Sequence, residues 1–171
     1  MPPVTIIDFE ASGLSDRSYP IEAAWSLNGG PVEEYLIDPS GVPAWRHWNA
    51  KAESVHGISM GRLLVEGLPP RLVCDRIRQV LTGRTVYSDH PDFDREWMRR
   101  LFEARGLPEP HLNWANYENF PCLCRLDPDV RGRIKNEARA RTQPAHRATN
   151  DVRFAMLLLQ LAKQGHTEKK Q

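Results

Sequence analysis

The chain has 171 residues, of which 40% are hydrophobic, and this size and composition suit one ordinary domain with a full core. No apolar run approaches the roughly 20 residues that a membrane-spanning helix needs, and the N-terminus lacks a signal-peptide pattern. We therefore expect a soluble, cytoplasmic protein with no membrane partner. The net charge is only +1, but acidic residues dominate positions 1–40 and basic residues dominate positions 125–147. An acidic site beside a basic border suits a polyanionic substrate, although a solvated loop explains the basic run equally well.

The first predicted element is a short buried strand that contains two carboxylates. Its apolar residues are Val4, Ile6, Ile7 and Phe9. Because residues i and i+2 of a strand project from the same face, Asp8 and Glu10 point in the same direction. Two ionised carboxylates side by side at the end of a buried strand repel each other, and a divalent cation is the simplest compensating charge. For this motif taken alone, an edge strand that ends in water is the alternative.

The next elements are also strands. Residues 21–27 and 32–37 are strand-like, and Asn28-Gly29-Gly30-Pro31 between them is typical of a hairpin turn. The first three strands should therefore form an antiparallel meander. Residues 38–70 are rich in Pro and Gly and predict loops and short helices.

The second half of the chain alternates between strands and helices, which indicates an α/β sheet with parallel strands. The pattern predicts a helix over 71–81, a strand at 85–87, a helix from about Asp92, a strand within 111–117 and a buried helix over 148–163. Residues 128–144 are too charged and irregular to assign. We expect residues 1–163 to form a single domain and residues 164–171 to be a disordered tail.

Two further aspartates lie where such a sheet would bring them to the first strand. Asp94 falls in the first turn of the helix after the fourth strand, and Asp151 falls in the first turn of the last helix, five residues after His146. Strand ends and helix starts meet at one edge of an α/β sheet, which is where these folds place their sites. Considered singly, each aspartate is explained as well by helix capping and the helix dipole.

These motifs, in the order Asp-x-Glu, Phe-Asp and His-x4-Asp, resemble the DEDDh 3′-to-5′ exonucleases of the RNase H-like superfamily. Proofreading subunits of bacterial polymerases and RNase T belong to that group, many members of which also contain a segment like Val55-His56-Gly57-Ile58. The resemblance runs from about Val4 to Ala162. It implies an RNase H-like α/β fold, in which a mixed five-stranded sheet of an antiparallel meander plus parallel strands is flanked by helices.

The resemblance also implies roles for individual residues. Four carboxylates would hold two divalent cations, Mg²⁺ or Mn²⁺, with a histidine as the general base: Asp8, Glu10, Asp94, Asp151 and His146. Five residues would contact the terminal nucleotide: Ala11, Ser12, Leu14, His56 and Ile58. This chain departs from the family by having His90 and Pro91 where Asn and Ala are frequent. We prefer Asp94 to Asp92 as the metal ligand, which leaves Asp92 as the expected helix N-cap.

The sequence therefore predicts a metal-dependent 3′-to-5′ exonuclease that acts on single-stranded DNA or RNA with a free 3′ end and releases nucleoside 5′-monophosphates. Carboxylates suit hard cations, and a neutral histidine can take the proton from the attacking water. A catalytically silent nuclease-like binding module and an RNase H-type endonuclease are the alternatives. The choice between DNA and RNA, a homodimer and a polymerase partner all stay open.

Overall fold

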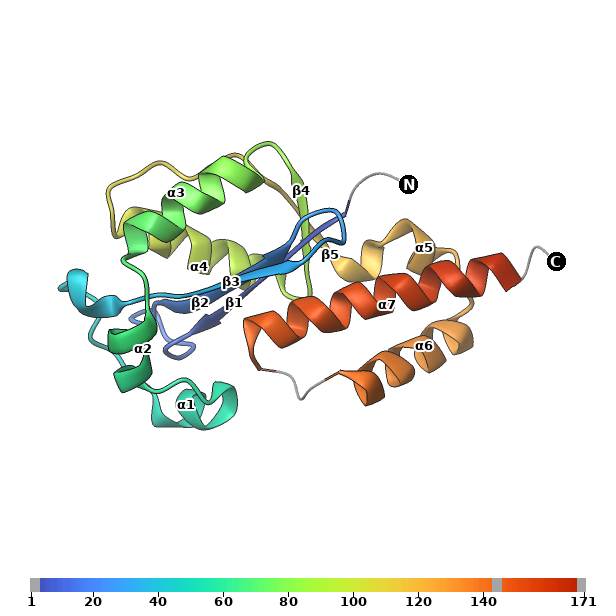
Figure 1. Ribbon diagram of the computed structural model, residues 1–171, viewed down its shortest axis with the longest axis horizontal. Coiled ribbons are helices and arrows are strands. Elements are labelled where there is room, and N and C mark those ends of the chain that lie inside the picture. Colours follow the sequence, from blue (N-terminus) through green and yellow to red (C-terminus); the bar gives the residue numbers. More distant parts are fainter. Residues whose placement is uncertain (1–3, 143–145, 169–171) are drawn as a thin grey trace.

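A five-stranded mixed sheet forms the centre of the molecule, with the strand order β3-β2-β1-β4-β5 (Figure 1). The computed structural model describes residues 4–142 and 146–168. The strands are β1 (Thr5–Ala11), β2 (Pro20–Ser26), β3 (Val32–Leu36), β4 (Thr85–Ser88) and β5 (Asn113–Asn116). The first three form an antiparallel meander, and β4 runs parallel to both β1 and β5. The predicted fold class is confirmed.

The turn between β2 and β3 has the backbone geometry that its sequence predicts. Asn28 and Gly29 both have positive φ angles, 57° and 76°, and the Gly30 N–H donates to the Leu27 carbonyl at 2.9 Å. Two successive positive φ angles match the right-handed twist of the flanking strands, and Asn-Gly is the residue pair that adopts them most readily. This turn fixes the register of β2 on β3, which pairs Ser26 with Val32 and Glu22 with Leu36.

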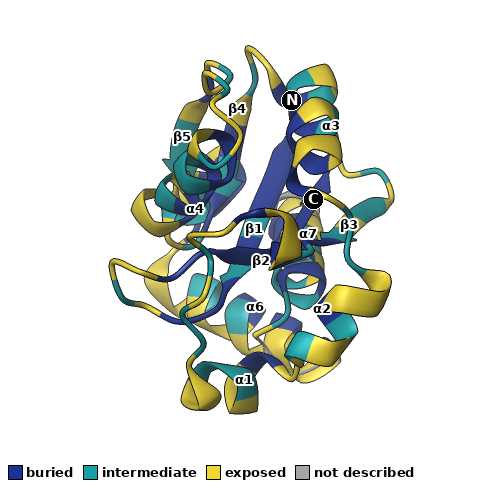
Figure 2. Cartoon of the chain, turned by 90° about the vertical axis from the view of Figure 1, so that its left-hand side faces the viewer, coloured by how far each residue is buried: buried dark blue, intermediate teal, exposed yellow. Residues whose placement is uncertain are grey.

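Helices cover both faces of the sheet (Figures 1 and 2). One face packs against α3 (Pro70–Leu81) and α4 (Pro91–Glu103), and the other packs against α7 (Ala148–Glu168) with α5 (Pro121–Cys124) and α6 (Pro128–Arg141) beside it. The segment between β3 and α3 contains α1 (Ala50–His56), α2 (Met60–Glu66) and the short helix η1 (Pro39–Gly41), and a second short helix, η2 (Tyr117–Asn119), follows β5. The prediction of loops and short helices over 38–70 is confirmed.

The side-chain alternation of β1 decides where its carboxylates go. Ile7 and Phe9 enter the core beneath α3 and α4, and Ile6 enters the core beneath α7. Asp8 and Glu10 have the same parity as Ile6, so they point to the α7 side of the sheet. They stand at the end of the strand where that apolar core stops, which leaves both carboxylates half-buried.

Three element boundaries differ from the sequence predictions. Residues 128–141 form α6, which buries only Ile134 and Ala138, so its apolar periodicity is too sparse to show in the sequence. Helix α7 continues to Glu168, so the predicted boundary at residue 163 is too early. Helix α4 begins at Pro91 with His90 as its N-cap residue, so Asp92 lies inside the helix. Proline favours the first helical position because its missing N–H has no helical partner there.

The described part of the chain contains neither a membrane-spanning helix nor a disulfide bond. None of the helices in the described part of the chain combines the length and the apolar character needed to cross a bilayer. The three cysteines all lie within the described residues and form no disulfide.

Candidate metal centre

The structure brings the four predicted carboxylates together from three separate elements. Asp8 is common to two groups of acids: its ligand oxygens lie within 4.8 Å of those of Glu10 and Asp151 in one group, and of Asp94 in the other. Glu10 shares β1 with Asp8, whereas Asp94 and Asp151 come from the first turns of α4 and α7. Two overlapping groups around one aspartate are the arrangement that two neighbouring cations require.

Asp94 is the most deeply buried of the four, at 3% exposure. Its Oδ1 accepts a hydrogen bond of 3.0 Å from the Phe9 backbone N–H, which ties α4 to the middle of β1. Its Oδ2 is buried and has no hydrogen-bond partner among the described residues. A buried carboxylate oxygen without a partner is costly, and a cation bound to it would remove that cost. The donor set of carboxylate oxygens also suits hard divalent cations.

His146 lies at the entrance to α7, beside Asp151. Its backbone N–H donates to Asp151 Oδ2 at 2.9 Å, and its φ angle is 72°, which is unusual for a residue other than glycine. The residue itself is exposed to solvent. The His-x4-Asp spacing therefore has a direct structural meaning: the aspartate fixes the backbone of the histidine at the edge of the carboxylate cluster.

Asp89 is a fifth acid in the cluster, and the sequence reasoning gave it no role. It directly follows β4, and its ligand oxygens lie within 4.8 Å of those of Asp8 and Asp94. The signal that could have identified it is its position at the carboxyl end of the strand that runs parallel to β1. The Phe-Asp motif indicates Asp94 but gives no indication of Asp89.

Burial and mutual repulsion raise the pKa of every predicted metal ligand. Loss of hydration is the largest cause in each case, and it raises the pKa of Glu10 and that of Asp94 to about 8. The pKa of Asp8 is raised well above its usual range, first by burial and then by the charges of Asp94, Asp151 and Glu10. Burial also raises the pKa of Asp151. Cations are the natural partners of such a cluster at neutral pH.

These shifts predict how the stability of the metal-free protein depends on pH. Folded Asp94 and Glu10 keep a proton up to about pH 8, whereas the unfolded chain releases it near pH 4. The folded state therefore binds more protons between these values, and the free energy of unfolding should fall as pH rises, by several kcal/mol between pH 5 and pH 8. Urea unfolding in EDTA at several pH values measures this. A stability that is flat or rises over that range would contradict the shifts, and Asp94→Asn should reduce the slope.

A cavity of about 350 Å³ opens on the α7 side of the carboxylates. Its walls combine the acids with apolar, aromatic and basic side chains: Ile6, Ile7, Asp8, Ser88, Asp89, Tyr117, Arg139, Thr142, Asp151, Phe154 and Ala155. The volume falls at the lower end of the range for small-ligand sites. Arg139 of α6 brings a positive charge to a cavity that is also lined by Asp8, Asp89 and Asp151.

Several solved structures are similar to this chain in fold. The chain aligns with the zinc-bound complex of E. coli ExoI with single-stranded DNA at 16% identity and a TM-score of 0.71, over 96% of this chain and 41% of that one. A moderately thermophilic exonuclease I from Methylocaldum szegediense aligns at 18% identity and a TM-score of 0.68, with the same coverage. A further exonuclease I structure aligns at 18% identity and a TM-score of 0.72, over 94% of this chain and 41% of that one.

The chain has the exonuclease I fold. That fold is RNase H-like, as the sequence resemblance implied. The chain spans about two-fifths of the length of these exonuclease I chains. No protein-family model and no curated protein sequence matches it.

Within this exonuclease I fold, a buried ion pair fixes the start of α7 on the sheet. Glu22 of β2 is fully buried and accepts hydrogen bonds from Arg147 Nη2 at 2.6 Å and from the Ala148 backbone N–H at 2.9 Å. Arg147 Nε adds contacts of 3.1 and 3.2 Å to the two Glu22 oxygens. Because Arg147 follows His146 directly, this pair holds both His146 and Asp151 against β1.

Removing one partner of this pair should be strongly destabilising. Glu22→Gln leaves the Arg147 guanidinium, which is only 24% exposed, without its counter-charge, and we expect a loss of about 3–5 kcal/mol in the free energy of unfolding. Glu137→Gln is the matched control, because Glu137 pairs with Arg141 on the exposed surface of α6 and should contribute less than about 1 kcal/mol. Denaturant unfolding of both variants measures the difference. Equal, small losses would show that the buried pair does not anchor α7.

The predicted nucleotide-contacting residues occupy very different environments. Four of them are buried in this structure: Ala11, Ser12, His56 and Ile58. His56 and Ile58 are linked by a hydrogen bond of 3.0 Å from the Ile58 N–H to His56 Nδ1. Leu14 is the opposite case, since 80% of it is exposed on the loop that follows β1. Of the five, Leu14 is therefore the residue whose side chain is presented to solvent.

Proposed function

We propose that this chain is a metal-dependent 3′-to-5′ exonuclease that removes nucleoside 5′-monophosphates from single-stranded DNA or RNA. The observation that carries the proposal is the convergence of Asp8, Glu10, Asp94 and Asp151 from β1, α4 and α7, with a buried Asp94 oxygen left without a partner. The exonuclease I fold supports it, because the E. coli structures of that fold include complexes with single-stranded oligonucleotides.

The carboxylates would hold two divalent cations, Mg²⁺ or Mn²⁺. Bound there, such ions supply charge stabilisation to the phosphoryl centre and the departing 3′ oxygen. The protein contributes rigidity to this arrangement: Asp94 is tied to the backbone of β1, and Asp151 is tied to the backbone of His146. Asp89 adds further negative charge at the same edge and strengthens the attraction for cations.

His146 is the proposed general base. Its place at the start of α7, exposed and adjacent to Asp151, lets the neutral imidazole take a proton from water that attacks the scissile phosphate. Asp151 accepts a hydrogen bond from the backbone N–H of His146, and Glu22 accepts one from the backbone N–H of Ala148. These two contacts fix the backbone from which the imidazole extends. Its freedom lies in the side chain alone.

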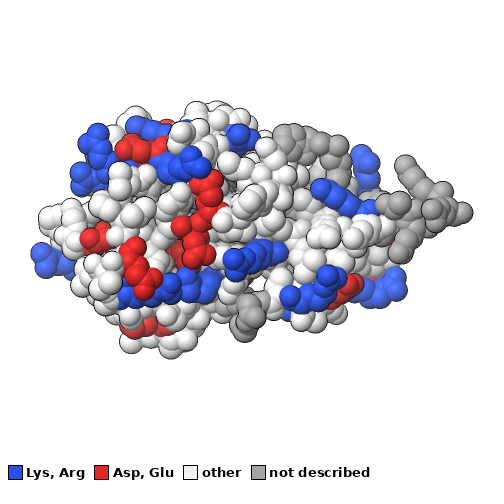
Figure 3. Space-filling view, in the orientation of Figure 1, with Lys and Arg blue, Asp and Glu red and all other residues white. Residues whose placement is uncertain are grey.

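The substrate would enter through the cavity beside Asp8. Arg139 and Tyr117 line this cavity together with the acids, and they offer a guanidinium suited to phosphate and an aromatic ring suited to a base. Figure 3 shows Lys and Arg side chains over α6 and α7 with few acidic side chains among them, whereas the other half of this face carries acidic and basic side chains together. The proposed nucleotide contacts of Leu14 and the backbone of Ala11 and Ser12 lie at the end of β1, and His56 and Ile58 would support them from beneath.

The two alternatives predict different products. A silent nuclease-like module would bind oligonucleotides without hydrolysis, and an RNase H-type endonuclease would cut internal bonds. The position of His146 beside Asp151 favours the exonuclease. All four metal carboxylates being present and convergent argues against a silent module.

The proposal is tested on 5′-labelled single-stranded DNA and RNA of equal sequence, compared side by side with Mg²⁺, with Mn²⁺ and with excess EDTA. We expect progressive shortening from the 3′ end with either ion and none in EDTA. The relative rates on DNA and RNA assign the substrate class. Hydrolysis that persists in excess EDTA, or a lack of hydrolysis with both ions, would overturn the proposal.

A further inference from the structure

The loop between β1 and β2 directly follows the strand that carries Asp8 and Glu10, and it exposes Leu14 to solvent. Ser12 closes its base through two contacts with Tyr19: the Ser12 N–H donates to the Tyr19 carbonyl at 2.9 Å, and the Tyr19 N–H donates to Ser12 Oγ at 3.2 Å. Ser15 and Ser18 close its tip, since each backbone N–H donates to the other residue, at 3.0 and 3.1 Å. These short-range hydrogen bonds shape the loop. At its base the Ser12 carbonyl also accepts a hydrogen bond of 3.0 Å from the Asn49 N–H, but that contact does not attach the tip of the loop, residues 15–18, to the rest of the molecule.

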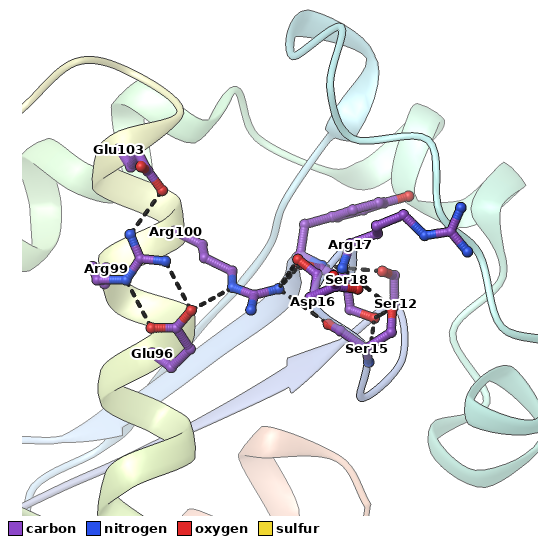
Figure 4. Close-up of polar contacts among 10 residues, drawn as sticks. Ser12, Ser15, Asp16, Arg17, Ser18, Glu96, Arg99, Arg100 and Glu103 are labelled. Atoms are coloured by element: carbon purple, nitrogen blue, oxygen red, sulfur yellow. Dashed lines mark hydrogen bonds and ion pairs between the residues drawn. The ribbon is translucent and has the colours of Figure 1, made fainter.

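Arg100 of α4 makes that attachment (Figure 4). Its Nη1 donates to three backbone carbonyls of the loop, those of Ser15 at 3.1 Å, Asp16 at 2.9 Å and Ser18 at 2.6 Å. These partners are more than 80 residues away in the sequence. Three carbonyl groups converging on one guanidinium nitrogen hold the loop in one conformation, because any rearrangement breaks several charge-assisted hydrogen bonds at once.

The Arg100 guanidinium is also held in place by two neighbours on its own helix. Arg100 Nε donates to Glu96 Oε1 at 2.7 Å, and the group lies over the Trp97 ring, 5.0 Å from its centroid. Only 18% of the Arg100 side chain is exposed. Glu96, Trp97 and Arg100 all belong to α4, the helix that supplies Asp94. One rigid helix thus fixes both a metal carboxylate and the loop beside it.

Arg99 provides a natural comparison on the same helix. It pairs with the same Glu96 at 2.7 Å and with Glu103 at 2.8 Å, so its hydrogen bonds run along α4 itself (Figure 4). The neighbouring arginines therefore share charge, helix and partner, and they differ in whether they reach the loop.

We propose that Arg100 is a positioning residue for substrate binding: it holds the 12–18 loop so that exposed Leu14 is presented to the 3′-terminal nucleotide. The inference rests on the proposed nuclease function. An unattached loop would have to be ordered when the substrate binds, and that entropic cost weakens binding. The contact between Leu14 and the terminal nucleotide is made in both the bound state and the transition state. Its loss therefore raises KM and leaves kcat largely unchanged.

The test compares Arg100→Met and Arg100→Lys with Arg99→Met. For Arg100→Met we expect the KM for a 5′-labelled single-stranded oligonucleotide to rise about tenfold or more, with kcat within about twofold of native. Arg100→Lys should show a smaller rise, because an ammonium can still donate to part of the carbonyl set. Arg99→Met should keep the native KM. Leu14→Ala combined with Arg100→Met should raise KM by less than the product of the single effects, because both act through one contact.

Trypsin cleavage after Arg17 reports on the loop independently of catalysis. We expect the initial cut at Arg17, an exposed residue of the loop, to be about tenfold faster in Arg100→Met than in Arg99→Met, with equal melting temperatures. Equal cleavage rates, or faster cleavage with a native KM, would overturn the proposal. If the native protein hydrolyses no substrate, the proposed nuclease function fails separately. In that case protection of Arg17 from trypsin by oligothymidylate supports the role of the loop in binding, and the absence of protection overturns it.

Discussion

Replacing Asp8 or Asp94 with asparagine is expected to abolish hydrolysis while leaving the protein folded. Asp8 belongs to both groups of converging carboxylates, and Asp94 supplies a buried oxygen that has no hydrogen-bond partner among the described residues. Losing a ligand of a hydrolytic cation removes several kcal/mol of charge stabilisation, which corresponds to a fall in kcat of at least about 10³-fold. The metal-free variants should melt at or above the native temperature, because asparagine is neutral without a proton, whereas a native aspartate in this buried cluster must bind one that the unfolded chain releases.

Asp92→Asn is the matched control for this experiment. Asp92 lies two residues before Asp94 in the first turn of α4 but is exposed and stands outside the converging groups. It should retain the native rate, which would also settle the choice between the two aspartates of this motif. A large fall in the melting temperature of the metal-free Asp8 or Asp94 variants would show that the carboxylates are structural. Native turnover in either variant would remove it from the site.

Replacing His146 with alanine is expected to lower kcat by roughly 10²- to 10⁴-fold, the usual contribution of a general base. The four carboxylates are untouched, so affinity for Mn²⁺ should change little. In the native protein the rate should rise with pH, because only the neutral imidazole can accept a proton from water. The variant should lose this part of the profile when assayed at saturating metal.

His111→Ala controls for the loss of a histidine at the surface. His111 is exposed, precedes β5 and lies outside the cavity beside Asp8. It should show native turnover and the native pH profile. If His146→Ala retained the native rate or an unaltered acidic limb, His146 would have no part in proton transfer, and the exonuclease reading would lose its main distinction from the endonuclease.

The position of the carboxylates could be predicted from the sequence because simple periodicities fix it. The alternation of β1 sends Ile7 and Phe9 to one core and Asp8 to the other face, and a parallel β4 brings the first turn of α4 to the same edge. His146 and Asp151 follow from the start of a long apolar helix. These features depend on local pattern and on the general geometry of α/β sheets.

The contacts that hold the site together could not be predicted in this way. Glu22 and Arg147 are 125 residues apart, and nothing in either segment indicates that they pair. The contact of Arg100 with the 12–18 loop likewise joins residues more than 80 positions apart. Helix α6 buries too few apolar residues to show a helical period, so the position of Arg139 in the cavity wall was also hidden. Long-range polar partners are decided by tertiary structure.

Identification of the first product under single-turnover conditions tests the central claim most directly. Enzyme in excess over a single-stranded oligonucleotide, with Mn²⁺ present, is quenched early and the products are identified by mass spectrometry. Asp8→Asn protein, purified in parallel, controls for contaminating nucleases. A 3′-to-5′ exonuclease built on these carboxylates releases the 3′-terminal nucleoside 5′-monophosphate and leaves an oligonucleotide one residue shorter. Internal fragments as first products, an intact oligonucleotide, or the same products from Asp8→Asn would contradict it.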